Sequence, residues 1–550
     1  MQLRPWQVEA NTKALKWLVE TKSDKHFLIN AAPGAGKTIA ACTIAKNLID
    51  IGEVDRVIVI APRVEVVKQW AEDFKRVTGR FMGRLVGSHD KIDIDVCATW
   101  AAVQGLLGAF QAVCRKDNVL VICDEHHHAA VRAAWGDGAE NAFVDAKFVL
   151  ILTGTPIRSD RKQSVWMAYD DEGHIDHPEE GSYTLSYGEA VELEYCRPAT
   201  FHRHEGRFTV DLEDGEVVSV SGESPADLTP TLKRIPGLQR ALNFYRLACT
   251  PQYEVDGKTP KLDGYQATMI GWAISKLTDL RYRMPNGGGL VIAPSIEVAE
   301  YIAKLIELME GEAPVVVHSQ TTNVEAKIES FRHTDRRWLV SVAMISEGVD
   351  IARLRVLVYL PNALTELAFR QGIGRVVRTS GPNDDTRAYV IMPSFDILEA
   401  YARRVEDEMS PTTRVDNGPA KTKKCPICAT EASINAKECE ACGHEFPQIP
   451  PRFKPCGSCG GLNTMAAKTC QHCGAGFGTH FTLTLDEALR TGAIVRGMDV
   501  DEADVQEGEQ LASSVRKAII QSGDEKLLKF MKLFPEETWG KMKKIMNDEG

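Results

Sequence analysis

Two acidic residues and three histidines follow one another in the stretch VICDEHHHAA, Val121 to Ala130. Such a cluster invites a metal site, but adjacent side chains point to opposite faces of a strand and diverge by about 100° on a helix. Three consecutive histidines therefore converge poorly on one ion, and no HExxH spacing is present. The apolar run Val119–Cys123 reads as a strand buried on both faces, and ligand-binding groups commonly follow such strands in open parallel sheets.

A second stretch with ligand-binding chemistry is AAPGAGKT, which fits the phosphate-loop pattern except that Ala31 replaces the leading glycine. Small residues such as Gly34 and Gly36 let backbone N–H groups close around phosphate oxygens at the start of a helix. Lys37 would reach the β- and γ-phosphates, and Thr38 would hold Mg²⁺. The loop therefore predicts a site for ATP.

The acidic pair completes this chemistry. Asp124 would hold Mg²⁺ through water, and Glu125 would orient or deprotonate the attacking water. We therefore interpret the opening stretch as a nucleotide-hydrolysis motif whose ion is Mg²⁺, in which the histidines need not be ligands.

Eight of the 14 cysteines form four Cys-x-x-Cys pairs near the C-terminus. They make two sets of identical spacing that start 31 residues apart: Cys425, Cys428, Cys439 and Cys442, then Cys456, Cys459, Cys470 and Cys473. Four thiolates suit tetrahedral Zn²⁺, so this tandem repeat predicts two zinc ribbons, over 425–447 and 456–477, with two Zn²⁺. Iron in a rubredoxin-like site and a redox disulfide are the alternatives. Nucleic-acid binding, protein docking and a stabilising cap all stay open as the role of the ribbons.

Composition sets the class of protein. A chain of 550 residues suffices for three or four domains. Its formal charge of −11 means that any nucleic-acid binding must come from local basic patches and grooves. We see no signal peptide and no apolar run of eighteen residues, so we expect a soluble, cytoplasmic protein without a membrane partner.

Two blocks of alternating strands and helices must position these residues. The first includes HFLINA, RVIVIAP, DIDVCAT, NVLVICD and KFVLILTG, and the second GLVIAP, APVVVHS, RWLVSV, RVLVYL and RAYVIMP. Such alternation predicts parallel α/β sheets. We divide the chain into a first α/β domain (1–195), a second (196–405) with a helical insertion near 221–283, a linker (406–424), the two ribbons and a helical tail (480–550).

The motifs of the two blocks resemble, in order, those of superfamily 2 helicases of the DEAD/DEAH type, over roughly residues 1–400. DEHH resembles the box that names the family, LRPWQ its adenine-sensing segment, and APRVEVVKQW, CATW, LTGTP, ISEGVD and QGIGRVVR its later motifs. The resemblance implies two RecA-like motor domains and a helicase-type ATPase.

The resemblance also implies roles for individual residues. Those implied to bind the nucleotide, besides the phosphate loop, are Arg4, Gln7, Gly348 and Asp350. Those implied to complete catalysis are Gln371, Arg375 and Arg378, with both arginines on one face of a helix, from which they stabilise charge on the γ-phosphate. Those implied to couple hydrolysis to movement are His127, Thr153 and Thr155. Those implied to contact nucleic acid are Arg63, Thr99, His318 and Ser319.

The implied function is an ATP-dependent DNA helicase or translocase. The LRPWQ start, compact motor and C-terminal ribbons look similar to RadD-type DNA repair helicases of bacteria. This implies work on single-stranded, duplex or branched DNA in repair, recombination or replication, alongside a single-strand-binding protein. The alternatives are a double-strand DNA translocase of a restriction, defence or mobile-element system, an RNA helicase, and a nucleotide-switched scaffold.

Overall fold

A computed structural model of the chain contains two compact units, which we describe separately: residues 1–190, and residues 191–345 with 351–499. The structure describes residues 3–61, 64–86, 92–125, 141–154, 166–169, 175–212, 217–222, 228, 241–342, 351–379, 384, 386–409, 422–424, 430–433, 439, 441–442, 453–455, 462–464, 471–472 and 479–489. Within these ranges, every helix is too short or too polar to span a bilayer.

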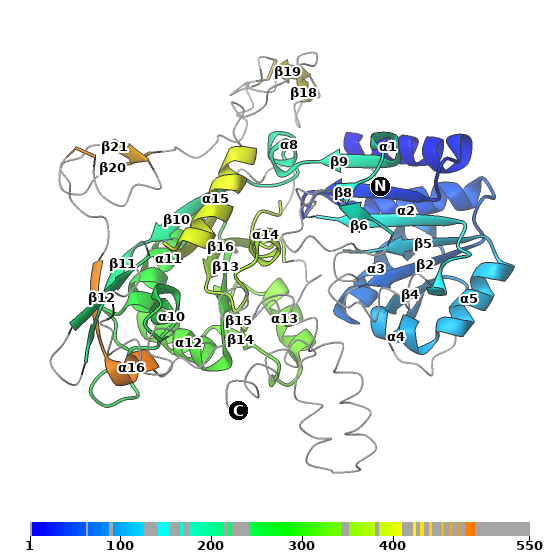
Figure 1. Cartoon of the computed structure of the whole chain (residues 1–550). Helices are drawn as coiled ribbons and strands as arrows, with labels where there is room; N and C mark the ends of the chain where they lie inside the picture. Colours follow the sequence, from blue (N-terminus) through cyan, green and yellow to red (C-terminus); the bar gives the residue numbers. More distant parts are fainter. Residues whose placement is uncertain are drawn as a thin grey trace, which may run out of the picture. The chain divides into compact units, whose positions relative to one another are not determined.

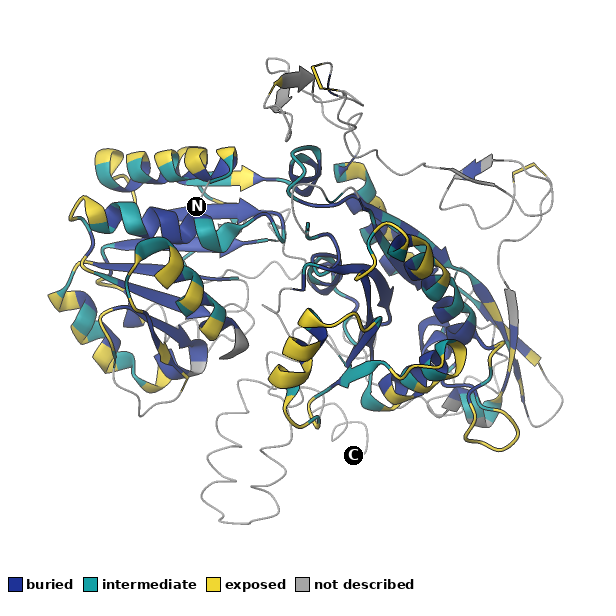
Figure 2. Cartoon of the chain, turned by 180° about the vertical axis from the view of Figure 1, so that it is seen from behind, coloured by how far each residue is buried: buried dark blue, intermediate teal, exposed yellow. Residues whose placement is uncertain are grey.

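The first unit is built on a seven-stranded sheet in the order β3-β4-β2-β5-β6-β1-β9, with all neighbours parallel (Figure 1). Its strands are β1 (His26–Ala31), β2 (Arg56–Ala61), β3 (Gly83–Leu85), β4 (Val96–Thr99), β5 (Val119–Cys123), β6 (Phe148–Thr153) and β9 (Ser182–Leu185). The five strands predicted for this block are confirmed. Every residue of β5 and β6 is buried, as expected for strands that are covered on both faces (Figure 2).

Helices and short elements connect these strands. They are α1 (Pro5–Leu15), a π-helical turn (Lys16–Thr21), α2 (Lys37–Asp50), α3 (Val64–Thr78), α4 (Trp100–Gly105), α5 (Leu107–Lys116), the pair β7 (Ala168–Tyr169) and β8 (Ile175–Asp176), a 3₁₀ turn (Glu179–Gly181) and α8 (Tyr187–Glu192). Helix α2 packs against α1 and α3. This packing places α1 beside the start of α2, where the phosphate loop ends.

The second unit is built on a six-stranded parallel sheet in the order β10-β17-β16-β13-β15-β14. Its strands are β10 (Ala199–His204), β13 (Gly288–Ala293), β14 (Val315–Val317), β15 (Trp338–Val342), β16 (Leu354–Tyr359) and β17 (Ala388–Pro393). The five strands predicted for the second block are therefore confirmed. The described part of the chain thus contains two parallel α/β units, as the sequence predicts.

Helices cover both faces of this second sheet. They are α10 (Phe244–Ala248), α11 (Tyr265–Arg281), α12 (Ile296–Glu310), α13 (Val324–His333), α14 (Glu366–Ile373) and α15 (Asp396–Glu408). Two successive residues of β10 point to opposite faces of the sheet. His202 stacks on Trp272 of α11, whereas Phe201 stacks on Phe369 of α14. Helix α11, from the stretch expected as an insertion, packs on β13, β16 and β17. It is therefore one of the layers of this unit.

A three-stranded sheet, in the order β12-β11-β22, adjoins α10 and α11 through aromatic contacts. Its strands are β11 (Gly206–Asp211), β12 (Val217–Ser221) and β22 (Thr479–Thr484), and α16 (Leu485–Leu489) follows. The prediction of a helical tail from residue 480 is wrong at its start. Phe481 and Leu483 are buried whereas Thr482 and Thr484 are exposed, and this alternation is the period of a strand.

The six cysteines outside the two cysteine modules are buried: Cys42, Cys97, Cys114, Cys123, Cys196 and Cys249. Burial raises the pKa of five of these thiols, those of Cys42, Cys97, Cys114, Cys123 and Cys249, to about 11 for Cys114 and about 12 for Cys249. They are small core residues, because the thiolate that a reactive cysteine needs is disfavoured in these surroundings.

Candidate nucleotide-binding site

The phosphate loop lies between the end of β1 and the start of α2. Gly34 and Gly36 have φ angles of 84° and 96°, in the left-handed region that glycine adopts most easily. A Cβ atom on Gly36 would lie 2.8 Å from the side-chain nitrogen of Gln7. Lys37, the first residue of α2, donates to the backbone oxygen of Ala31 over 2.9 Å. The predicted strand, loop and helix are therefore present, and the helix start provides N–H groups and a dipole for phosphate.

The acidic pair lies at the same edge of the sheet as this loop. Asp124 and Glu125 follow β5 directly, and β5 is separated from β1 only by β6. A Glu125 carboxylate oxygen lies 3.8 Å from the Lys37 ammonium, and the other accepts the Gly154 N–H over 3.4 Å. Thr38, the predicted second Mg²⁺ ligand, is half-buried in the first turn of α2. A hydroxyl and a carboxylate are the hard oxygen ligands that suit Mg²⁺, so the residues present fit the expected ion.

Glu125 has an unusual backbone. Its φ angle is 48°, which places a residue with a side chain in the left-handed region. This conformation costs of order 1 kcal/mol for a residue other than glycine, and such costs concentrate at functional sites. The strain therefore lies on the residue for which the sequence predicts catalysis.

A buried tryptophan orients the other acid. The indole N–H of Trp70, on α3, donates to Asp124 Oδ2 over 2.7 Å, and Trp70 and Asp124 are 1% and 9% exposed. No sequence motif pointed to this role of Trp70. A tryptophan on a core-facing stripe gives no sign of a polar partner until the fold brings one to it.

The start of α1 binds the phosphate loop from outside. The Arg4 guanidinium and the Trp6 indole both donate to the Ala35 oxygen, over 2.8 and 3.2 Å. Gln7 Nε2 donates to the Gly36 oxygen over 3.0 Å, while its Oε1 accepts the backbone N–H of Arg4. Arg4 and Gln7 are thus at the predicted site, where they fix the loop backbone, and their contact with adenine stays a prediction. Sequence reasoning did not find the contribution of Trp6.

Thr153 ends β6 in register with Asn30 of β1 and is fully buried, so it lies between the acids and the phosphate loop. Its role in coupling stays a prediction. Five other candidate residues lie outside the described residues: Arg63, His127, Thr155, Gly348 and Asp350.

The arginines of the QGIGRVVR motif do not share a helix face, which corrects the prediction. Helix α14 ends at Ile373, Arg375 lies in the following turn, and Arg378 pairs with Cys196 in an isolated bridge. Val376 and Val377 are both buried, and a continuing helix would turn these neighbours about 100° apart. The chain turns instead, and Val377 accepts the Arg197 N–H. Gln371, Arg375 and Arg378 are half-buried residues of the second unit, and their role at the nucleotide stays a prediction.

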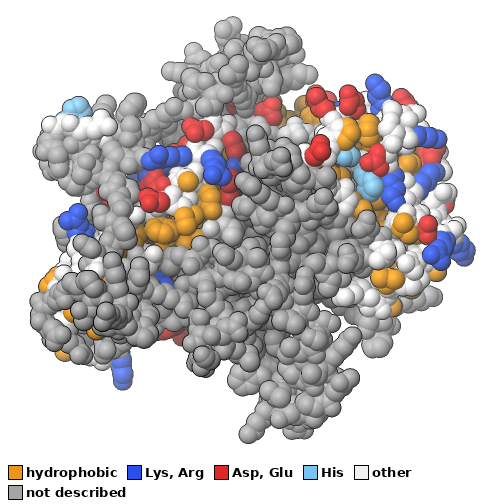
Figure 3. All heavy atoms as spheres, in the orientation of Figure 1, with side chains coloured by type: hydrophobic (Ala, Val, Ile, Leu, Met, Phe, Trp, Pro, Cys, Tyr) orange, Lys and Arg blue, Asp and Glu red, His pale blue; other side chains and the backbone are white. Residues whose placement is uncertain are grey.

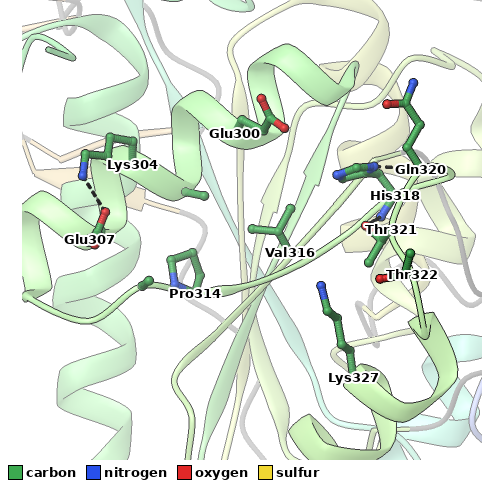
Figure 4. Close-up of a pocket in the computed structure, with 12 residues that line it drawn as sticks. Glu300, Lys304, Glu307, Pro314, Val316, His318, Gln320, Thr321, Thr322 and Lys327 are labelled. Carbon is green, nitrogen blue, oxygen red and sulfur yellow. Dashed lines mark hydrogen bonds and ion pairs between the residues drawn. The ribbon is translucent and has the colours of Figure 1, made fainter. Parts of the chain in front are cut away.

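The candidate nucleic-acid contacts lie in both units. The Thr99 hydroxyl accepts the Ala102 N–H as the N-cap of α4, and the residue is only 7% exposed. In the second unit, His318 lines a pocket of about 500 Å³ beside the edge strand β14, while Ser319 is exposed next to it (Figure 4). Lys304 and Lys327 project into this pocket along with acidic residues of α12. Polymer binding by these residues stays a prediction.

In each module, the two strands of a short hairpin flank the first Cys-x-x-Cys pair in the sequence. One joins β18 (Thr422–Lys424) to β19 (Glu431–Ser433), and the other joins β20 (Phe453–Pro455) to β21 (Leu462–Thr464). Each strand of the second hairpin begins 31 residues after its counterpart, so the structural repeat has the period of the cysteines.

Only Cys439, which is buried, and Cys442, which is exposed, lie within the described residues. The other predicted zinc ligands lie outside them: Cys425, Cys428, Cys456, Cys459, Cys470 and Cys473. Across the described ranges, no three His, Cys, Asp or Glu side chains are grouped as a metal site requires. The zinc prediction therefore rests on the sequence and on the repeated hairpins.

Comparison with protein families matches both units. Residues 1–158 match the family described as "Type III restriction enzyme, res subunit", and residues 272–380 match "Helicase conserved C-terminal domain". The first match falls on the first α/β unit and the second on the second unit. The first match includes the phosphate loop and the acidic pair described above.

Related sequences extend over much of the chain. An uncharacterized protein of Mycobacterium tuberculosis (strain ATCC 25618 / H37Rv) is 31% identical over 407 residues, which are 74% of this chain and 63% of that protein. An uncharacterized protein of Mycobacterium leprae (strain TN) is 30% identical over 410 residues, which are 74% of this chain and 64% of that protein. The match thus spans less than two thirds of the length of these relatives.

Solved structures of helicases are more distant. The Pyrococcus furiosus Hef helicase domain aligns with a TM-score of 0.40 and 17% identity, over 73% of this chain and 98% of that one. S. cerevisiae Dbp5 bound to RNA and ADP BeF3 aligns with a TM-score of 0.44 and 14% identity, over 74% and 92%.

Proposed function

We propose that this protein is an ATP-dependent DNA helicase or translocase that acts in DNA repair, recombination or replication in the cytoplasm. One observation supports the ATPase step above the others. A Glu125 carboxylate oxygen lies 3.8 Å from the Lys37 ammonium at the end of β5, beside the phosphate loop.

The proposed reaction converts ATP and water to ADP and phosphate. Backbone N–H groups at the start of α2 and the Lys37 ammonium bind the phosphates, and Glu125 orients the attacking water and accepts its proton. Mg²⁺, bound by Thr38 and Asp124, would neutralise charge on the phosphate oxygens. Arg375 and Arg378 stabilise the charge that develops on the γ-phosphate, and opening and closing of the two units steps the protein along DNA.

A double-strand DNA translocase of a restriction, defence or mobile-element system is the second candidate. The match of residues 1–158 to a restriction-enzyme subunit family favours it. A displaced-strand assay on forked DNA separates the two candidates, because a translocase of this kind hydrolyses ATP on duplex DNA without releasing a strand.

Turnover of ATP by the full chain tests the main proposal. The rate is measured without polymer and with single-stranded DNA, duplex DNA, forked DNA and RNA, with Glu125→Gln as the control. We expect stimulation by one form of DNA and loss of turnover in the variant. Stimulation by RNA alone would identify an RNA helicase. Glu125-dependent turnover that ignores every polymer would exclude a translocase, and absence of turnover would leave a nucleotide-switched scaffold.

The proposal includes two structural Zn²⁺ ions, one in each cysteine module, and nucleic acid as the molecule that the modules bind. The repeated hairpins support it, because each carries a Cys-x-x-Cys pair between its two strands in the sequence. We expect two zinc ions per chain by elemental analysis, and one in a Cys442→Ser chain. Iron in place of zinc, or a metal-free disulfide, would refute this part. A single-strand-binding protein is the proposed protein partner, tested by co-purification.

A further inference from the structure

One arginine precedes the motif glutamine on α14, and its partners bind it to the next helix. Arg370 donates through Nη1 and Nη2 to the two carboxylate oxygens of Glu408, over 3.0 and 2.5 Å. Its Nε donates to Glu366, one turn earlier on α14, over 3.0 Å. Two parallel N–H···O bonds fix orientation as well as distance, so α14 cannot rotate about its axis without breaking the pair.

The surroundings make this contact more than a surface ion pair. The Arg370 and Glu366 side chains are 12% and 7% exposed, and Glu366 also pairs with Arg404 of α15. Blue and red side chains gather over α15 in Figure 3. Exposed pairs contribute little, but a network that is partly withdrawn from water is screened less. Two ion pairs, Arg370–Glu408 and Arg404–Glu366, thus join α14 to α15.

Apolar contacts and the Arg370–Glu408 ion pair restrain α14 in different ways. Phe369 stacks on Phe201 at 5.9 Å between ring centres, and a Cβ atom on Gly372 would lie 2.8 Å from the ring of Tyr359. These contacts keep α14 on the sheet, but apolar contacts are non-directional, whereas a paired hydrogen bond fixes orientation. The Arg370–Glu408 pair restrains the rotation of α14 at the residue next to Gln371.

We propose that Arg370 is a positioning residue for hydrolysis: through its ion pair with Glu408 it fixes α14, and so holds Gln371 and Arg375 in place within the second unit. This role rests on the proposed ATPase activity. Arg370 is not one of the residues proposed to bind the nucleotide or the metal. It acts through the following turn, where the Gly374 N–H bonds the Arg370 oxygen and the Arg375 N–H bonds the Gly372 oxygen. Movement of α14 is therefore transmitted directly to Arg375.

The chain contains a matched control on the same helix. Glu406 accepts the two terminal nitrogens of Arg203, over 3.0 and 2.9 Å, and its side chain is 29% exposed against 33% for Glu408. Arg203 lies on β10, which carries none of the motif residues. The two glutamates thus differ in what they fix and little in geometry or exposure.

The experiment compares Glu408→Gln with Glu406→Gln in the full chain, by melting temperature, by affinity for a fluorescent ATP analogue and by DNA-stimulated turnover. We expect both to melt slightly and equally lower, since each loses one such pair, and to bind the analogue within about twofold of wild type. Glu408→Gln should lower kcat by about tenfold and leave the KM for ATP within about twofold, because misplaced groups cost most in the transition state. Glu406→Gln should keep kcat within about twofold.

A third variant keeps the test sharp if Glu408→Gln does not fold. Glu408→Asp retains the charge and one bond to Arg370, and should restore most of kcat. Equal kcat in the Glu408→Gln and Glu406→Gln chains, whether both normal or both reduced, would overturn the role of Arg370 alone. A wild-type chain without Glu125-dependent turnover would overturn the ATPase proposal first, and this role with it.

Discussion

The left-handed backbone of Glu125 predicts an unusual order of stability among inactive variants. Glu125→Ala and Glu125→Gly both remove the carboxylate and its contact with Lys37, so they differ only in the backbone. At a φ of 48°, alanine keeps the strain and glycine relieves it. A glycine is favoured over alanine at such a position by about 1 kcal/mol, although glycine is the less stable choice almost everywhere else.

Ala112, exposed on α5 of the same unit, supplies a control of opposite sign. Ala112→Gly replaces alanine inside a helix and should destabilise the unit by about 1 kcal/mol. For a unit of this size, about 1 kcal/mol shifts the melting temperature by roughly 2–4 °C.

Scanning calorimetry of the nucleotide-free chain provides the measurement. The transition that Ala112→Gly lowers identifies the first unit, and Glu125→Gly should melt roughly 2–4 °C above Glu125→Ala in that transition. Turnover of ATP should be lost in both. A Glu125→Gly chain that melts below Glu125→Ala would refute the left-handed conformation of Glu125.

Three further predictions concern other buried groups. Burial lowers the pKa of His204 from 6.5 to about 4, so the unfolded chain binds more protons in this window. Stability, measured by urea unfolding, should fall by about 2 kcal/mol from pH 7 to pH 5, and a His204→Gln chain should lack this part of the loss. Trp70→Phe removes the donor to Asp124, which should lower the free energy of unfolding by about 2 kcal/mol and raise the Mg²⁺ concentration for half-maximal turnover. In an Asp124→Asn chain the same substitution should lower the free energy of unfolding by less. Phe481→Ala empties a buried site beside Tyr265 and should destabilise the second unit by about 3 kcal/mol in thermal unfolding, whereas a loss below about 1 kcal/mol would show that β22 does not pack there.

The nucleotide site could be predicted because its parts follow strands that are easy to recognise. The runs that end at Ala31 and Cys123 are apolar without alternation, so both read as strands of a parallel sheet. Carboxyl ends of parallel strands lie at one edge, which brings the phosphate loop and the acids together without further information. The distance of 3.8 Å between Lys37 and Glu125 follows from topology as much as from the motifs.

Other features depend on contacts that no local pattern shows. The helix expected through Arg378 ends at Ile373, and the segment that follows bonds instead to the distant residues Cys196 and Arg197. The strand β22 was missed because six alternating residues between a glycine-rich module and a helix signal little by themselves. Its pairing with β11 joins segments more than 260 residues apart. The hydrogen bond from Trp70 to Asp124 depends in the same way on tertiary packing.

The position of β22 also constrains how the cysteine modules can act. Helix α15 and strand β22 belong to the second unit, and both cysteine modules lie between them in the sequence; Phe481 of β22 packs against Phe208 and Tyr265. Both ends of the segment 410–478 are therefore joined to packed elements of this unit. A polymer bound by the modules would be tied to the second unit by two connections instead of one. Under the proposed function, such a tether would keep a bound polymer near the second unit and raise its effective concentration there.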